Sequence, residues 1–201
     1  MTTVIEVNNL TKRFGKLTAL NDVSFTVEHN TIHGLLGRNG AGKTTLMQLL
    51  TGQQFATSGS IRVFGERPVE NARVLGNVCF IKESQKYPDD FTANHVFRSA
   101  PWFFPAWDAE YAQRLIADFR LPLSRRIKKL SRGQLSSIGV IVGLASRAPL
   151  TFFDEPYLGS MPWHDRPFTT DCSRITRTTP ARWCCPPTSS TRSVTSSRTS
   201  W

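Results

Sequence analysis

The segment 37–44, which reads G-R-N-G-A-G-K-T, constrains the fold of this chain more than any other. It matches the phosphate-loop pattern G-x-x-x-x-G-K-[ST], whose glycines let successive backbone N–H groups point inward around an anion. A short apolar run over 31–36 predicts a buried strand before the loop, and residues 44–50 predict a helix that stops at Gly52. Strand, loop and helix together predict a nucleotide-phosphate site. The alternative is a glycine-rich turn with a chance lysine.

The rest of the first 159 residues alternates between strand and helix patterns. Strands are predicted over 3–7, 23–27 (after a turn at Asn21-Asp22), 60–64, 78–81 and 150–153, and helices over 92–120 and 131–146. This alternation predicts an α/β fold with a largely parallel sheet. No strand is predicted between about 84 and 146, so that stretch is interpreted as a helical insertion.

The apolar strand predicted over 150–153 ends on Asp154-Glu155. A carboxylate at the end of a buried strand suits a Mg²⁺ ion held with the Thr44 hydroxyl, while Lys43 reaches the β- and γ-phosphates. The second carboxylate, Glu155, can orient and polarise an attacking water as a general base. A polar strand end without function is the alternative, and it becomes weaker once the phosphate loop is considered with it.

Residues 130–134 read L-S-R-G-Q and open the predicted helix over 131–146. They resemble the LSGGQ signature of the ABC (ATP-binding cassette) ATPases, with Arg132 in place of the first glycine. A chance N-cap serine is the alternative, but it does not explain why Asp154-Glu155 follows about twenty residues later, as in that family. The resemblance covers residues 1 to about 159. It implies an α/β P-loop NTPase fold, namely an ABC-type ATPase core (1–159) with a helical subdomain at about 84–146.

The resemblance also implies roles for individual residues. Ser131 and nearby N–H groups would cap the γ-phosphate of ATP held by a second subunit. Phe14 lies where the family has an aromatic that stacks on adenine, although a core phenylalanine is equally compatible with the sequence. Aligned without a gap, Glu83 takes the glutamine position of the family's Q-loop and Gln85 lies two residues on, and either of them could face the magnesium.

The complete set of predicted site residues falls into five groups. The nucleotide-binding residues are Phe14, Gly37, Asn39, Gly40, Ala41, Gly42, Lys43, Thr44 and Thr45. The catalytic residues are Lys43 and Glu155, and the Mg²⁺ ligands are Thr44 and Asp154. The signature residues are Ser131, Arg132, Gly133 and Gln134, and the Q-loop candidates are Glu83 and Gln85.

By this resemblance the chain is an ATP-binding and ATP-hydrolysing subunit of an export-type bacterial ABC transporter. Its expected partners are an integral-membrane permease and a second ATP-binding subunit, and its expected location is the cytoplasmic face of the cell membrane. The aromatic run 101–107 is either a surface for the permease or ordinary core packing. No apolar run is long enough to span a membrane, and the start of the chain does not resemble a secretion signal.

The net charge of +10 raises the alternative of a non-transport ABC ATPase acting on nucleic acid. Much of that charge lies after residue 160, and a phosphate site with a solvated face accounts for the rest, so no nucleic-acid partner is expected. Cys79 sits in an apolar strand pattern, where a buried structural thiol is expected.

Residues 160–201 differ in composition from everything before them. They are rich in Ser, Thr and Pro without a sustained period, which predicts a disordered tail with no core. After Gly159 the family continues with Leu-Asp, a helix, a buried strand and a histidine that contacts the γ-phosphate. None of these is present in this sequence, so the C-terminal part of the ATPase core is incomplete. An inactive fragment that binds nucleotide weakly or not at all is therefore an alternative function.

A shifted reading frame accounts for the tail. When the third base of each codon is read with the first two bases of the next, residues 161–162 force Ala and residues 183–185 force Val-Leu. With permitted codons elsewhere, 159–161 can read Leu-Asp-Ala, 168–177 an amphipathic helix, and 181 onward a buried strand followed by the histidine. We therefore predict a one-base loss near the Gly159 codon, low stability because apolar sheet surface is left uncovered, partial nucleotide binding and severely impaired hydrolysis.

Overall fold

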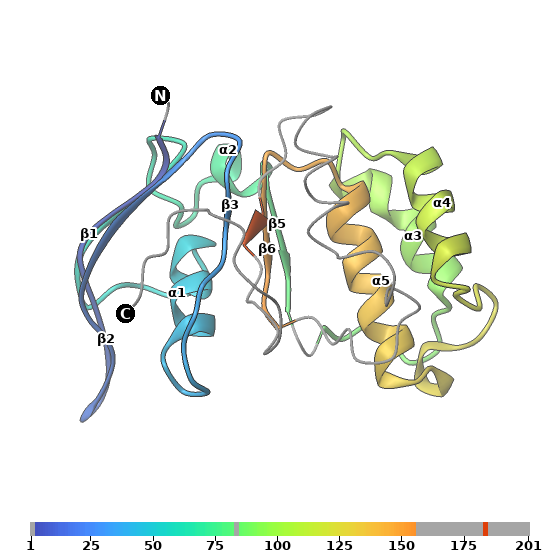
Figure 1. Cartoon of the computed structure of the whole chain (residues 1–201), viewed down its shortest axis with the longest axis horizontal. Helices are drawn as coiled ribbons and strands as arrows, with labels where there is room; N and C mark the ends of the chain where they lie inside the picture. Colours follow the sequence, from blue (N-terminus) through green and yellow to red (C-terminus); the bar gives the residue numbers. More distant parts are fainter. Residues whose placement is uncertain (1–2, 83–84, 156–182, 185–201) are drawn as a thin grey trace, which may run out of the picture. The chain divides into compact units, whose positions relative to one another are not determined.

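The computed structural model describes residues 3–82, 85–155 and 183–184. The chain divides into two compact units, Met1–Val78 with Arg182–Trp201 and Cys79–Ala181, and each is considered by itself (Figure 1). Among the described residues, no helix is both long and apolar enough to cross a membrane.

The first unit is built on an antiparallel sheet of β1 (Thr3–Phe14), β2 (Leu17–Glu28) and β4 (Ser58–Val63), in the order β2-β1-β4. Both long strands extend well beyond the short segments predicted from alternation. The prediction of a largely parallel sheet missed this antiparallel sheet, because strand direction is decided by pairing across the chain rather than by the local apolar pattern.

The predicted turn at Asn21-Asp22 is wrong. Both residues lie inside β2, and the hairpin turns instead at Gly15 and Lys16. Asp22 has φ 54° and accepts a 2.8 Å hydrogen bond at Oδ1 from Nδ2 of Asn9, which has φ 47°. Asn and Asp tolerate the left-handed region, and here they form an irregularity in the strand pair rather than a chain reversal.

One face of this sheet supplies the core of the first unit. Val4, Ile5, Val7 and Leu10 of β1 are each at most 1% exposed. Helix α1 (Lys43–Leu50) packs against β2 and β4 and buries Leu46, Met47, Leu49 and Leu50. This helix confirms the prediction over 44–50, with Gly52 at φ +67° just beyond its end.

The remaining elements of the first unit are short. They are β3 (Ile32–His33), α2 (Ala72–Leu75) and β7 (Trp183–Cys184). β3 covers only two residues of the apolar run predicted as a strand, and it pairs in parallel with β7. Of the predicted tail, the structure describes only these two residues of β7, so the prediction for the others stays a prediction.

The second unit layers three helices on two neighbouring strands, β5 (Val78–Ile81) and β6 (Leu150–Phe153), where β5 begins at the last residue of the first unit. Helix α5 (Arg132–Ala145) contacts β6, and α3 (Ala93–Phe103) and α4 (Ala109–Asp118) contact α5 (Figure 1). A 3-10 helix, Ile127–Lys129, precedes α5. The bounds of β5 and β6 are those predicted from the sequence.

Glycines allow α5 to approach the strands closely. A Cβ on Gly139 would lie 2.8 Å from Ile81 Cγ2, and one on Gly143 would lie 2.5 Å from Phe153 Cζ. Cys79 is 2% exposed nearby, and burial raises the pKa of its thiol to about 12, against an opposing hydrogen bond with Ser146. Cys79 is therefore an inert core thiol, as predicted.

Candidate nucleotide-binding site

The loop 37–42 carries no regular structure and leads directly into α1, which begins at Lys43. Gly40 and Gly42 have φ of +84° and +83°, which L side chains rarely adopt. A Cβ on Gly42 would also lie 2.5 Å from the backbone oxygen of Ala19 in β2, and one on Gly37 would lie 3.0 Å from Ala41 Cβ. The loop is therefore wound tightly against β2, and its shape depends on these glycines.

The side chain of Lys43 folds back over this loop. Its Nζ donates hydrogen bonds to the backbone oxygens of Gly37, at 2.8 Å, and Arg38, at 3.2 Å. The Ala41 N–H donates to the Arg38 oxygen at 3.0 Å, which closes the turn. An ammonium group and the positive end of α1 thus lie at one short loop, and the first turn of α1 contains no acidic residue. This combination favours an anion such as phosphate.

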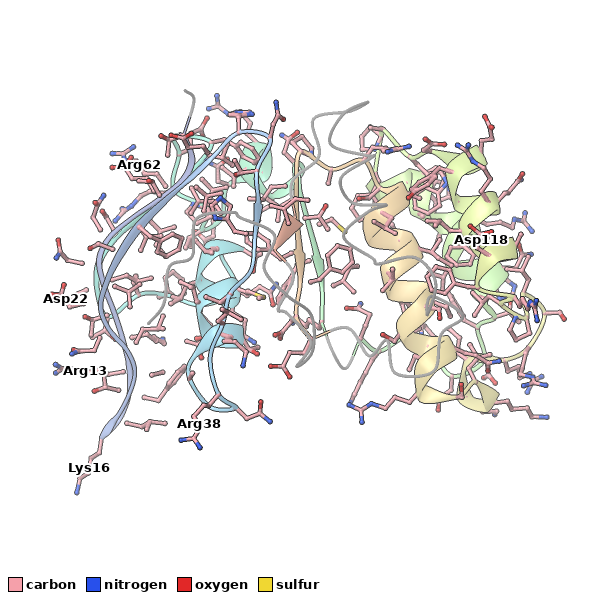
Figure 2. The ribbon with its side chains drawn as sticks, in the orientation of Figure 1. Arg13, Lys16, Asp22, Arg38, Arg62 and Asp118 are labelled. Atoms are coloured by element: carbon pink, nitrogen blue, oxygen red, sulfur yellow. The ribbon has the colours of Figure 1, made fainter. Side chains whose placement is uncertain are left out.

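The other loop residues lie at the surface of the same unit. Asn39, Gly40, Ala41 and Thr44 are exposed, and Thr45 is half-buried in the first turn of α1. Arg38 extends from the loop toward the end of the unit where the β1–β2 hairpin turns (Figure 2). The nucleotide-binding residues predicted in the loop therefore form one continuous surface segment.

Phe14 is the last residue of β1 and belongs to the same unit as the loop. Its side chain is 44% exposed, so core packing is not its role. The Nζ of Lys12 lies 4.6 Å from the centroid of the Phe14 ring. Sequence reasoning missed Lys12, although residues two apart in a strand share a face, and that spacing was the available signal.

Asp154 and Glu155 follow β6 in the second unit. All four residues of the strand are buried, as is Asp154 at 5% exposure, and the Asp154 N–H donates to the Ile81 oxygen at 2.8 Å. Glu155 is half-buried and has φ 44°, in the left-handed region, which other non-glycine residues such as Phe64 and Arg147 also adopt.

The signature residues form the start of α5. The Oγ of Ser131 accepts a hydrogen bond from the Gln134 N–H at 3.2 Å, and the Ser131 N–H donates to Gln134 Oε1 at 3.1 Å. This reciprocal pair is a capping box, a role for Gln134 that the S-x-x-Q spacing alone could have revealed. Arg132 is exposed, and Gly133 is buried. Ser131 is thus a helix cap whatever further role it has.

The Q-loop candidates are Glu83 and Gln85. Glu83 lies outside the described residues, and Gln85 is half-buried, with its N–H donating to the Lys82 oxygen at 3.2 Å. Two residues further on, burial raises the pKa of the Tyr87 hydroxyl, so this tyrosine stays protonated. Sequence reasoning did not single out Tyr87.

The aromatic run 101–107 contains both exposed and half-buried rings. Trp102 and Phe103, at the end of α3, are 82% and 71% exposed, whereas Phe104 and Trp107 are half-buried. Core packing is therefore wrong for Trp102 and Phe103. An exposed pair of large apolar rings is typical of an interaction surface.

The predicted site residues are divided between the two units. The first unit holds Phe14 and the loop, and the second holds Gln85, Ser131, Arg132, Gly133, Gln134, Asp154 and Glu155. Within the described residues, no group of three or more His, Cys, Asp or Glu forms a metal cluster.

The glycine-rich loop that leads into α1 has the sequence pattern and the left-handed glycines of a P-loop. Residues 20–158 match the ABC transporter family, and the chain belongs to it.

Known proteins resemble the chain in sequence and in structure. It is 31% identical over 153 residues to the ABC transporter ATP-binding protein YtrB of Bacillus subtilis, with 76% of this chain and 52% of YtrB covered. It is 30% identical over 162 residues to the bacitracin transport ATP-binding protein BcrA of Enterococcus faecalis, with coverages of 79% and 53%. The chain thus spans about half the length of these relatives.

Two solved structures share the fold. The ATP-binding subunit of an ABC transporter aligns with a TM-score of 0.78 and 25% identity, covering 92% of this chain and 80% of that one. The ATP-binding cassette MJ0796, solved as a dimer in a post-hydrolysis state with ADP and Pi, aligns with a TM-score of 0.74 and 15% identity, covering 90% and 87%. The expected fold, an ABC-type P-loop NTPase, is confirmed.

Proposed function

We propose that this chain binds ATP at the loop 37–44 as the ATP-binding subunit of an ABC transporter, and that it hydrolyses ATP slowly because its residues after Gly159 lack the family's Leu-Asp and γ-phosphate histidine. The observation that carries the proposal is the loop itself, in which left-handed glycines, the start of α1 and the Lys43 ammonium come together. Backbone N–H groups and one lysine are the donors that a triphosphate requires. Membership of the ABC transporter family supports this activity, and the names of YtrB and BcrA, both ATP-binding proteins, support the binding of ATP.

Each predicted residue has a role in this proposal. The loop and Lys43 hold the β- and γ-phosphates, and the exposed ring of Phe14 stacks on adenine. Glu155 accepts a proton from the attacking water, and Gln85 or Glu83 contributes near the metal.

Two side chains, one in each unit, supply oxygen donors suited to a Mg²⁺ ion. The Thr44 hydroxyl and the Asp154 carboxylate are hard oxygen donors of the type that Mg²⁺ prefers, and Asp154 is buried. When bound, the ion supplies neutralisation of phosphate charge. Thr44 and Asp154 would hold it, while Lys43 places its own positive charge on the same phosphates.

Two protein partners belong to the proposal. One is a second ATP-binding subunit, whose bound ATP is contacted at the γ-phosphate by Ser131 and the start of α5 of this chain. The dimer of the similarly folded MJ0796 supports such an assembly. An integral-membrane permease docks on the helical part of the second unit. The exposed Trp102 and Phe103 support that contact and a location at the cytoplasmic face of a membrane.

Paired measurements of ATP binding and of phosphate release test the proposal. Glu155→Gln should leave the Kd for ATP within about twofold and lower the hydrolysis rate by about 100-fold or more, because general-base catalysis contributes about that much. Asp118→Asn, an exposed change on α4, serves as the matched control (Figure 2).

Two outcomes would contradict the proposal. A purified chain that binds no ATP would support the alternative of an inactive fragment. Hydrolysis that survives Glu155→Gln at the rate of the Asp118→Asn control would remove Glu155 from the catalytic step.

A further inference from the structure

The ammonium of Lys12 has two partners in the first unit. It lies 4.6 Å from the centroid of the Phe14 ring, and it donates a hydrogen bond to the backbone oxygen of Phe55 at 2.8 Å. Lys12 and Phe14 share a face of β1 because they are two residues apart in a strand. The lysine therefore bridges the end of β1 to a loop 43 residues away in sequence.

That loop, residues 53–57, follows α1 and is tied to the same end of β1. The Thr57 N–H donates to the Thr11 oxygen at 2.9 Å, and the Arg13 N–H donates to Thr57 Oγ1 at 2.9 Å. Thr57 is thus attached to the residues on both sides of Lys12 in the strand, once through its backbone N–H and once through its hydroxyl. The Phe55 oxygen lies two residues before this attachment, on the same exposed loop.

We propose that Lys12 is a positioning residue for the nucleotide base: it covers part of the Phe14 ring and holds the exposed remainder in one orientation for adenine. This inference rests on the proposed stacking of adenine on Phe14. A cation over an aromatic face is attracted by the ring quadrupole, and here a hydrogen bond also fixes the cation. The ring is then ordered before the base arrives, so less rotational freedom is lost on binding.

The expected effect is modest and specific to the base. An exposed cation–π contact accounts for about a two- to fivefold change in an equilibrium constant. Lys12→Met should therefore raise the Kd for ATP about two- to fivefold and leave the Kd for inorganic tripolyphosphate, which has no base, unchanged. Lys12→Arg keeps both the cation and a donor and should restore the Kd for ATP.

The experiment measures both ligands on the full chain and on five variants. These are Lys12→Met, Lys12→Arg, Phe14→Ala, the double variant with Lys12→Met and Phe14→Ala, and Lys16→Met. Lys16→Met removes the same charge from the exposed tip of the β1–β2 hairpin and controls for net charge (Figure 2). Because Lys12 acts through Phe14, the double variant should bind ATP no more weakly than Phe14→Ala alone.

The outcomes separate this inference from the proposed function. An equal loss of ATP and tripolyphosphate binding in Lys12→Met would make Lys12 a phosphate ligand or a folding requirement and would overturn the inference. The inference would also be overturned if Phe14→Ala weakened ATP binding but Lys12→Met did not, or if the losses of ATP affinity added up in the double variant. In both cases the stacking of adenine on Phe14 would still stand. If Phe14→Ala leaves ATP binding unchanged, the stacking itself fails. Lys12→Gln is a second variant should Lys12→Met not fold.

Discussion

At the scale of single residues, Gly42 meets two independent constraints. Its φ of +83° is left-handed, and any Cβ would lie 2.5 Å from the Ala19 oxygen and 2.9 Å from Leu20 Cδ2. The first constraint penalises every L side chain, and the second requires β2 to move away from the loop. The phosphate loop therefore depends on this position for its shape as well as for its hydrogen bonds.

Replacement of Gly42 by Ala should lower the free energy of unfolding by about 2–4 kcal/mol and the affinity for ATP at least about tenfold, because both strain and steric overlap act there. Chemical denaturation and an ATP titration measure the two effects. Gly65→Ala is the matched control, since Gly65 has φ +79° but a Cβ added there would have no atom within 4 Å. It should lose about 1 kcal/mol and no ATP affinity. Equal effects in both variants would contradict the account of Gly42.

The phosphate loop could be recognised from sequence because its pattern directly specifies backbone geometry at Gly40 and Gly42. The cap formed by Ser131 and Gln134 is equally local. Lys12 could not be assigned a partner in the same way, because its anchor is a backbone oxygen distant in the chain. A contact of that kind depends on how the loop after α1 returns to β1.

At the scale of elements, the start of α4 is attached to the end of α5 and to Arg147, two residues beyond it. Arg147 donates from Nη2 to Asp108 Oδ2 at 2.6 Å and from Nε at 3.1 Å, and its guanidinium lies 4.6 Å from the centroid of the Tyr111 ring. The Asp108 N–H also donates to the Ala145 oxygen at 2.9 Å. Asp108 meanwhile caps α4 through the Tyr111 N–H, so one carboxylate joins two helices.

Asp108→Asn should lower the free energy of unfolding by about 1.5–3 kcal/mol, because asparagine still caps a helix but leaves the largely buried Arg147 cation without its counter-ion. Asp90→Asn is the matched control. Asp90 pairs with Arg126 and Lys128 at 3.5 and 3.6 Å but is 79% exposed, so its loss should cost less than about 0.5 kcal/mol. Urea denaturation of both variants measures the difference, and equal losses would show that burial does not strengthen the Asp108 pair.

The same carboxylate gives a pH dependence with a defined sign. Desolvation raises the pKa of Asp108, but the Tyr111 N–H and Arg147 outweigh it and hold the pKa below its ordinary value of 3.8. The ionised form is thus favoured by folding, and its contribution is present above the ordinary value and lost as the pH falls through the lowered one. The difference in stability between wild type and Asp108→Asn should therefore shrink below about pH 4. A difference that stays constant to about pH 2 would contradict this sign.

Elements with strong local signals were predicted well, and those decided by distant contacts were not. β5, β6 and α5 follow from their apolar runs and their caps. The helix predicted over 92–120 is instead two helices, α3 and α4, because Asp108 caps a new helix start after Phe104 and Pro105. The antiparallel pairing of β1 with β2 and β4 required partners that no local pattern identifies.

At the scale of the whole molecule, the family match ends at residue 158, next to the abrupt change in composition. The described strand β7, Trp183–Cys184, falls within the stretch that the shifted reading frame makes a buried strand. Both observations agree with a one-base loss near the Gly159 codon, which stays a prediction.

Sequencing of the DNA through the Gly159 codon tests it. A second experiment restores one base at that codon. The repaired chain should continue as Leu-Asp and melt at a higher temperature, since the added strand and helices cover apolar sheet surface. Its ATP hydrolysis should exceed that of the present chain by about tenfold or more, because it regains a histidine at the γ-phosphate. An intact, independently confirmed frame across the junction would refute the prediction.

The close packing of α5 on β5 and β6 affects more than the core. Because Gly143 faces Phe153 and Gly139 faces Ile81, α5 lies too close to the strands to leave room for a side chain at either position. Ser131 caps the start of that helix, and Asp154 and Glu155 follow the strand on which it packs. The signature and the acidic pair thus depend on the same close packing, so a larger residue at Gly139 or Gly143 should disturb both of them.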